Sequence, residues 1–159
     1  MPDSIMLESP ELLAKLQNDY PEFSFEESAR FSWHAGKRVV SYRKEALRTK
    51  NGAWALLHEL GHALFDHTDY TNDIELLQME VAAWEKAREL CTYYGLPIDE
   101  DYVQDCLDSY RDWLHTRATC PTCFIRCLQK DTHSYLCHNC GTSWRVTRSR
   151  HCRPYRRKN

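Results

Sequence analysis

The chain of 159 residues has no long hydrophobic run. None of its apolar stretches approaches the roughly 20 residues that a transmembrane helix needs, so the sequence predicts no membrane span. Its first residues, MPDSIMLES, also lack the basic and apolar regions of a secretory signal peptide. We therefore expect a cytoplasmic protein.

Internal repeats are absent apart from two CxxC pairs, and the only compositionally biased segment is a basic C-terminal tail. Disulfides are rare in the reducing cytosol, so the 8 cysteines are better interpreted as metal ligands and free thiols than as a disulfide framework.

The charge is unevenly distributed. Residues 1–119 contain 12 basic and 22 acidic side chains, whereas residues 120–159 contain 9 basic and 1 acidic, for a net charge of −2. Together with a hydrophobic content of 42%, this predicts a compact acidic domain with a small basic appendage. We predict a domain over residues 1–118, a metal-binding ribbon over 119–144 and a basic tail over 145–159.

The most informative motif is HELGH, inside the largely apolar run AWALLHELGHALF from Ala53 to Phe65. Residues four apart lie above one another on a helix, so His58 and His62 can reach one metal ion, with Glu59 beside it. This is the HExxH arrangement of zinc peptidases. The alternative is a buried helix whose histidines only satisfy each other or the backbone. Burying two histidines and a carboxylate without partners costs free energy, which argues against that alternative.

Hydrophobic periodicity and capping residues predict an α+β fold, in which a β-hairpin and several helices carry the motif. The expected elements are a helix from Ser9 to about Asp19, a hairpin between Phe23 and Tyr42, a helix from Asn51 to His67 that contains the motif, a helix from Asp73 to Tyr94 that is capped by Asp73 and stopped by Gly95, and a helix from Asp99 to His115.

A catalytic zinc takes three protein ligands and keeps one position for water, so a third ligand must lie elsewhere in the sequence. The candidates are Glu80, His67, Asp69, Asp73 and Glu75. Glu80 is favoured because it interrupts an apolar helical stripe, where a carboxylate needs a positive partner. An ion pair with Arg88 is the alternative for Glu80, and His67 is better explained as a residue that contacts a ligand than as a ligand.

These residues predict a mechanism. Zinc lowers the pKa of its bound water and polarises the scissile carbonyl. Glu59 takes the proton and returns it to the leaving amine. The hairpin can offer an edge strand for an extended peptide. The candidates for a second group that stabilises the oxyanion are Tyr93, Tyr94, His67 and Arg88.

HELGH at 58–62, followed by Glu80-Val-Ala-Ala-Trp84, resembles the gluzincin branch of the zincin peptidases and is similar to ImmA/IrrE-type metallopeptidases. The resemblance implies a catalytic zinc on His58, His62 and Glu80, Glu59 as the base, and cleavage of regulatory DNA-binding proteins. SprT-like peptidases are a second comparison, because they join HExxH to a C-terminal zinc ribbon.

The second strong motif is the pair Cys120-Pro-Thr-Cys123 and Cys137-His-Asn-Cys140. Four cysteines at this spacing predict a closed four-cysteine zinc site, which is structural because no position stays open. A redox or disulfide function is the alternative. Cys127, His133 and His138 are spare donors.

Aromatic residues, Trp144, His151 and Tyr155, are interleaved with the basic residues of the tail. Cations with aromatic rings suit phosphates and stacked bases, so the tail predicts a nucleic-acid partner. The residues concerned are Arg145, Arg148, Arg150, Arg153, Arg156 and Arg157. The alternative is a solvated tail, or one that docks on the acidic domain of its own chain.

The sequence thus predicts a zinc metalloendopeptidase with one catalytic and one structural Zn²⁺, acting on an intracellular protein, with a nucleic-acid-associated protein as one candidate. The alternatives are a nucleic-acid-binding ribbon protein with an inactive zincin scaffold, and a module that docks a partner protein.

Overall fold

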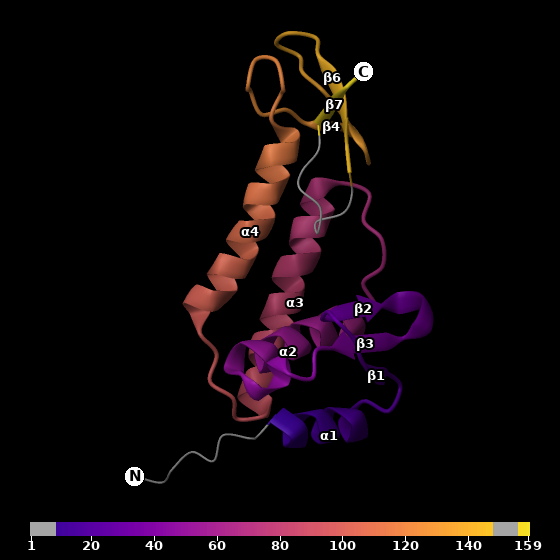
Figure 1. Ribbon diagram of the computed structural model, residues 1–159, viewed down its shortest axis with the longest axis vertical. Helices are drawn as coiled ribbons and strands as arrows, with labels where there is room; N and C mark the ends of the chain where they lie inside the picture. The colour runs from indigo at the N-terminus through magenta and orange to yellow at the C-terminus, as the bar shows by residue number, and fades with distance from the viewer. Residues whose placement is uncertain (1–8, 148–155) are drawn as a thin grey trace. The chain divides into compact units, whose positions relative to one another are not determined.

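The structure is a computed structural model and describes residues 9–147 and 156–159 (Figure 1). Within these residues it contains four α-helices and two small sheets, which confirms the predicted α+β class. The elements are α1 (Ser9–Asp19), β1 (Ser24–Glu27), β2 (Ser32–His34), η1 (Ala35–Lys37), β3 (Val39–Tyr42), η2 (Ala46–Arg48), α2 (Lys50–Leu64), α3 (Asp73–Tyr93), α4 (Glu100–Ala118), β4 (Gln129–Asp131), β5 (Ser134–Leu136), β6 (Ser143–Val146) and β7 (Arg156–Lys158). No helix in this part of the chain has the length and apolar character needed to cross a membrane.

Contacts between residues divide the chain into two compact units. The first contains the described residues up to Asp69 together with Met79–Glu100, and the second contains Tyr70–Gln78 and the described residues from Asp101 onwards. The predicted domains, 1–118, 119–144 and 145–159, stay a prediction.

The first unit contains the predicted hairpin. Strand β2 pairs antiparallel with β3, with Trp33 opposite Val40, and η1 joins the two. Strand β1, which the sequence analysis did not predict, runs parallel to β3 on its other side. Consequently β3 is the central strand and is buried from Val39 to Ser41, whereas β2 is an edge strand that contacts α2 (Figure 1).

Helix α2 carries the HExxH motif and begins one residue earlier than predicted, at Lys50. Thr49 caps it, since its hydroxyl oxygen accepts a hydrogen bond of 3.1 Å from the Gly52 amide. A Cβ on Gly52 would lie 1.8 Å from the carbonyl oxygen of Ala46, so this glycine lets η2 pack against the helix start.

Helix α3 ends at Tyr93, one residue before the predicted Tyr94, and Gly95 stops it as predicted. Gly95 has a left-handed φ of 68°, and the amide of Leu96 bonds back to the carbonyl of Cys91, which closes the helix. The predicted cap was wrong. The side-chain oxygen of Asn72 accepts a hydrogen bond of 2.9 Å from the Glu75 amide, and Asp73 is already the first helical residue.

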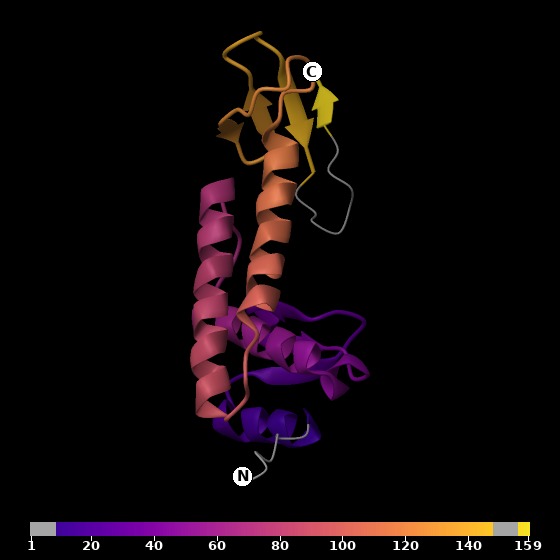
Figure 2. The same cartoon turned by 90° about the vertical axis from the view of Figure 1, so that its left-hand side faces the viewer.

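The second unit ends in a four-stranded antiparallel sheet with the order β4-β5-β6-β7, which follows directly after α4 (Figure 2). Helix α4 runs to Ala118, three residues beyond the predicted end at His115. The small core of the ribbon is formed by Cys120, Tyr135, Cys137, Trp144 and Val146. Because two of these five residues belong to the cysteine cluster, little apolar area stabilises the ribbon without a metal.

A buried arginine joins the ribbon to the helices of the same unit. Arg117 is 1% exposed, and its guanidinium lies 4.5 Å from the ring centroid of Trp113. The indole N–H of Trp144 donates to the Arg117 carbonyl at 3.0 Å, and the hydroxyl of Tyr135 donates to the carboxylate of Asp73. The ribbon is therefore fixed to the end of α4 and to the first turn of α3.

Candidate metal centres

Three predicted ligands meet in the first unit. His58 and His62 extend from α2, and their Nε2 atoms lie 3.1 Å apart. Glu80 extends from α3, with one carboxylate oxygen 3.1 Å from Nε2 of His58 and the other 3.4 Å from Nε2 of His62. All three side chains are buried. Their donor atoms form a group that could hold a metal ion.

The spacing of these atoms fits a tetrahedral ion. Ligand atoms about 2.0–2.1 Å from a tetrahedral zinc lie roughly 3.3 Å from one another. The two Nε2 atoms are 3.1 Å apart, and the two oxygens of Glu80 lie 3.1 and 3.4 Å from them, one oxygen beside each nitrogen. In addition, the oxygen of Glu80 nearest His58 is buried, and it makes no well-oriented hydrogen bond to a described residue, although Nε2 of His58 lies 3.1 Å away. A metal ion would satisfy that oxygen and both nitrogens at once.

Close packing of two helices places Glu80 at the site. A Cβ on Gly61 would lie 2.6 Å from the carbonyl oxygen of Ala83 and 3.2 Å from its Cα. Only a glycine at this position lets α3 approach α2 so closely. Gly61 is the fourth residue of the motif, and its role was not predicted from the sequence. In the sequence, the small residues Gly61 and Ala83 could have indicated that the two helices pack closely.

His67 reaches the site because α2 ends in a tight turn. Asp66 has a left-handed φ of 50° and its amide bonds to the Ala63 carbonyl, while the His67 amide bonds to the His62 carbonyl at 3.0 Å. The helix thus ends at Leu64, earlier than the predicted His67. The turn brings the two histidine rings to a centroid distance of 5.0 Å.

The Nδ1 atoms of His62 and His67 are 2.8 Å apart, which is a hydrogen bond. If Nε2 of His62 binds a metal, its Nδ1 carries the proton and donates to His67. The backbone of His67 is itself fixed, because the indole N–H of Trp33 donates to its carbonyl at 2.9 Å. His67 therefore contacts His62, a candidate ligand, and links it to strand β2.

The charges at this site shift the pKa values of Glu80, His62 and His67. Burial would raise the pKa of Glu80, but the imidazoles of His58 and His62 hold it well below its usual range. Burial would lower the pKa of His62, but the carboxylates of Glu80 and Glu59 raise it. For His67, burial and the charge of His62 lower the pKa.

Glu59 is half-buried on α2 between the two histidines of the motif. It is not part of the ligand group, which leaves its carboxylate available for proton transfer. Trp84 was not among the predicted site residues, although its ring stacks on His58 with a centroid distance of 4.3 Å. This contact orients His58, and it could not be read from the sequence, because it depends on how α2 and α3 pack.

The other candidates for the third ligand make different contacts. Glu75 accepts hydrogen bonds from Thr71, and Asp73 accepts one from Tyr135. Asp69 is exposed. The alternative ion pair between Glu80 and Arg88 is not formed, since Arg88 binds Glu100 at 2.8 Å.

Of the four candidates for the oxyanion group, only His67 is placed against the ligands by a described contact. Tyr94 donates its hydroxyl proton to Asp19 at 2.7 Å, and Arg88 is engaged by Glu100. Tyr93 is 76% exposed and packs against Tyr94.

A cleft of about 480 Å³ lies beside His67. It is formed by edge strand β2, by η1 and by the segment that follows α2. Its lining residues are Trp33, His34, Ala35, Gly36, Lys37, His67, Thr68 and Asp69. His67, which lines this cleft, bonds to His62, a candidate metal ligand.

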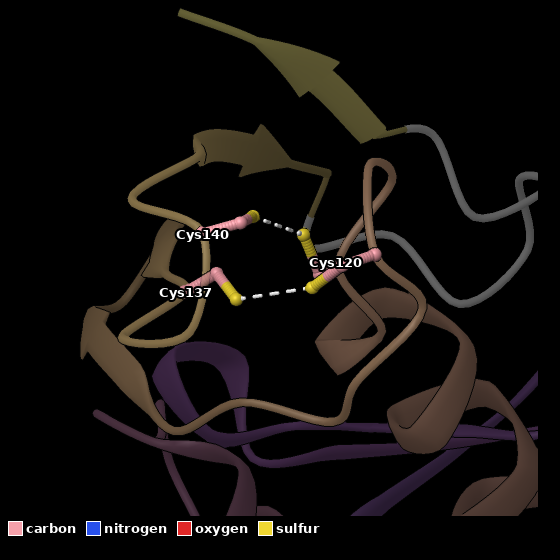
Figure 3. A group of neighbouring side chains, drawn as sticks. Cys120, Cys137 and Cys140 are labelled. Atoms are coloured by element: carbon pink, nitrogen blue, oxygen red, sulfur yellow. Dashed lines mark hydrogen bonds between the residues drawn. The ribbon is translucent and has the colours of Figure 1, made fainter.

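The second group that could hold a metal ion is Cys120, Cys123, Cys137 and Cys140. Figure 3 shows Cys120, Cys137 and Cys140 facing one another from the loop after α4 and the loop between β5 and β6. The sulfur atoms of Cys120 and Cys140 are 3.6 Å apart, and those of Cys123 and Cys137 are 3.5 Å apart. Sulfurs about 2.3 Å from a tetrahedral zinc would be roughly 3.8 Å apart, so the cluster fits such an ion.

The chemistry of the cysteines agrees with this geometry. Burial would raise the pKa of Cys120, but hydrogen bonds from the backbone amides of Cys123 and Thr122 lower it to about 6, which favours the thiolate that binds metals. Cys127 has a pKa raised to about 11 by burial and by Cys137, so it remains a protonated thiol. Neither Cys127 nor the spare donors His133 and His138 belong to the group.

The structure describes only part of the basic tail. Arg145 and Arg157 are exposed, whereas Arg156 donates to the carbonyl of Thr119 at 2.6 Å. Trp144, which the sequence analysis counted among the aromatic rings of the tail, is fully buried and stacks on Tyr135. The remaining predicted residues lie outside the described part of the chain: Arg148, Arg150, His151, Arg153 and Tyr155.

Comparison of the chain with protein-family models, with curated proteins and with solved structures finds no match. The assignment of both centres therefore depends on their donor atoms and geometry alone.

Proposed function

We propose that this protein is a zinc-dependent metalloendopeptidase of the zincin type. The observation that carries the proposal is the convergence of His58, His62 and Glu80 on one point, with Glu59 beside it on α2. Three protein ligands leave one position for water, which distinguishes a catalytic zinc site from a closed structural one. We assign a second, structural zinc to the four cysteines of the ribbon.

A zinc ion in the first site would supply a Lewis acid that polarises the scissile carbonyl and acidifies the attacking water. Glu59 accepts the proton of that water on its carboxylate and delivers it to the nitrogen of the leaving amine. His62 remains oriented during this step through its hydrogen bond to His67. The negative charge of Glu80 offsets part of the charge of the ion.

In this proposal, the peptide substrate lies along strand β2. Its outer edge pairs with no other described strand, so an extended peptide can add to the sheet there. The cleft of about 480 Å³ beside His67 would take a substrate side chain. Because His67 both lines this cleft and contacts His62, a peptide on β2 would have its carbonyl close to the metal.

The competing function is an inactive zincin scaffold that only supports the ribbon. Glu59 favours the peptidase, because a purely structural metal site has no need of a carboxylate between its two histidine ligands. The ligand set of His58, His62 and Glu80 also favours the peptidase, because three protein ligands leave one position for water.

Metal analysis and proteolysis of three proteins test the proposal. The wild type should contain about two zinc ions per chain, His58→Ala about one, and Glu59→Gln about two. Incubation with a cell lysate, followed by mapping of new N-termini, should show cleavages with the wild type that Glu59→Gln does not produce. Equal cleavage patterns for the wild type and Glu59→Gln would contradict the peptidase assignment.

A further inference from the structure

The ribbon sheet has two different faces. On one face, Tyr135 and Trp144 stand opposite each other and are buried. On the other face, the register places Ser134, Arg145 and Arg157 in one row across strands β5, β6 and β7. This second face is called the outer face.

Arg145 and Arg157 are directly opposite each other in the pairing of β6 with β7, and both are exposed. Like charges at directly opposed positions of a sheet destabilise it. Within the described residues, neither guanidinium forms an ion pair, and the neighbour on β5 is the neutral Ser134. The arrangement becomes favourable when an anion lies between the two cations.

The outer face is also hollowed. A depression of about 430 Å³ is lined by Lys130, Asp131, His133, Ser134, Arg145 and Asn159. Its one acidic side chain is engaged in the turn, since the carboxylate of Asp131 accepts hydrogen bonds from the His133 amide at 2.9 Å and from the Ser134 hydroxyl at 2.6 Å. Lys130 and Arg145 add positive charge to this depression.

We propose that the outer face binds the phosphate backbone of a nucleic acid, with Arg145 and Arg157 on neighbouring phosphates. Guanidinium groups bind phosphate through paired hydrogen bonds. The described part of the ribbon from Cys120 onwards supports a polyanionic ligand, because it contains six basic residues and one acidic residue. This inference does not depend on the peptidase activity.

The side-chain environments define the mode of binding. Trp144 is the aromatic residue next to Arg145, and because it is buried it cannot stack on a base. Arg156 is held by the Thr119 carbonyl and faces the other side of the sheet from Arg157. Arg145 and Arg157 therefore contact phosphates, and the affinity of the outer face should depend steeply on salt.

Anisotropy titrations of the zinc-loaded full chain test this inference. The probes are labelled single- and double-stranded DNA and a poly-glutamate peptide of equal charge, each over a series of salt concentrations. Arg145→Ala/Arg157→Ala should bind DNA at least about 10-fold more weakly, and its log–log salt slope should fall by about 2, because two phosphates are no longer neutralised. Lys44→Ala/Lys50→Ala, which changes the net charge equally on exposed residues outside the ribbon, should bind like the wild type.

Three results would overturn the proposal. They are no binding of DNA by the wild type, equal affinity of the wild type and Arg145→Ala/Arg157→Ala, and binding of the poly-glutamate peptide as tight as that of DNA. The last result would assign the face to an acidic protein. Zinc content and circular dichroism show whether each variant is folded, and Arg145→Lys/Arg157→Lys, which keeps both charges, should retain most of the salt slope.

Discussion

His67 has a larger role at the residue scale than its position after the HExxH motif indicates. Its ring contacts His62, a candidate metal ligand, its carbonyl is bound by Trp33, and its side chain lines the cleft beside strand β2. Residues that orient a metal-bound histidine typically contribute 10- to 100-fold to metal affinity. In the proposed peptidase, His67 would connect the position of the substrate to the geometry of the metal.

His67→Ala should accordingly weaken zinc binding at the first site by about 10- to 100-fold, while the ribbon keeps its zinc. Competition with a chromophoric chelator measures this difference. His115→Ala, which removes an exposed histidine from α4, is the matched control and should bind both ions normally. Unchanged zinc affinity in His67→Ala would show that His62 does not need this hydrogen bond.

Cys91 differs from the cysteines of the ribbon. It is 1% exposed, and burial raises the pKa of its thiol to about 11. Since the thiolate is the reactive form, we expect Cys91 to resist iodoacetamide at about pH 8 in the native protein and to react on unfolding. Mass spectrometry of the alkylated peptides checks this. Rapid labelling of Cys91 under native conditions would contradict the burial of this helix face.

The raised pKa of Cys91 also has a defined effect on stability. The unfolded chain loses this proton near pH 9, before the folded protein does. The stabilisation that the buried, protonated thiol of Cys91 gives the folded protein is therefore complete below that pH and is lost as the pH rises towards 11.

Residues of both centres could be predicted from the sequence, because their spacing carries the chemistry. Two histidines one helical turn apart and two CxxC pairs constrain their own geometry. The stacking of Trp84 on His58, the burial of Trp144 and the buried guanidinium of Arg117 could not, because each depends on contacts between elements far apart in the chain.

At the scale of elements, the spacing of α2 and α3 decides whether Glu80 reaches His58 and His62. Gly61 sets that spacing through a backbone contact with Ala83. No rotation of a side chain can relieve a clash with a carbonyl oxygen, so the helices must separate if Gly61 gains a Cβ.

Gly61→Ala should therefore destabilise the protein by about 1–3 kcal/mol and lower zinc affinity at the first site. Denaturant titration and chelator competition provide the two measurements. Gly36→Ala is the matched control, because a Cβ there would meet no atom within 4 Å, and it should leave both quantities unchanged. Wild-type stability and affinity in Gly61→Ala would contradict the described packing of α2 on α3.

Strand β1 could not be predicted from the sequence, whereas the hairpin of β2 and β3 could. The hairpin of β2 and β3 is local, and the turn at Ala35-Gly36 marks it in the sequence. Strand β1 pairs in parallel with β3 and not with β2, the next strand along the chain, and β1 is mostly exposed, so it lacks a clear hydrophobic alternation. Helix ends were off by up to three residues. For α2, the Thr49 cap sets the start and the left-handed Asp66 sets the end, and periodicity shows neither.

At the scale of the whole molecule, the two units differ in what stabilises them. The first has a broad core that includes Leu12, Leu16, Leu56, Leu57 and Leu60, all fully buried. Among the described residues, the core of the ribbon contains five buried residues, and two of them are cysteines of the metal group. The ribbon should therefore depend on its metal for folding, whereas the first unit should not.

Removal of both ions with a strong chelator should increase hydrogen exchange at the amides of β5 and β6 by several orders of magnitude. The amides of β3, in the core of the first unit, should remain protected and provide the internal control. Exchange followed by mass spectrometry distinguishes the two regions. Continued protection of β5 and β6 in the metal-free protein would mean that Tyr135 and Trp144 suffice to stabilise the ribbon.

The stacking of Trp144 on Tyr135 also makes Trp144 an intrinsic fluorescent probe of the ribbon. The indole is 0% exposed, and its ring centroid is 5.4 Å from that of Tyr135. The other four tryptophans of the chain all precede the ribbon. Subtracting the emission of Trp144→Phe from that of the wild type would isolate one fluorophore, and its red shift in stopped-flow experiments would time the opening of the ribbon without any attached dye.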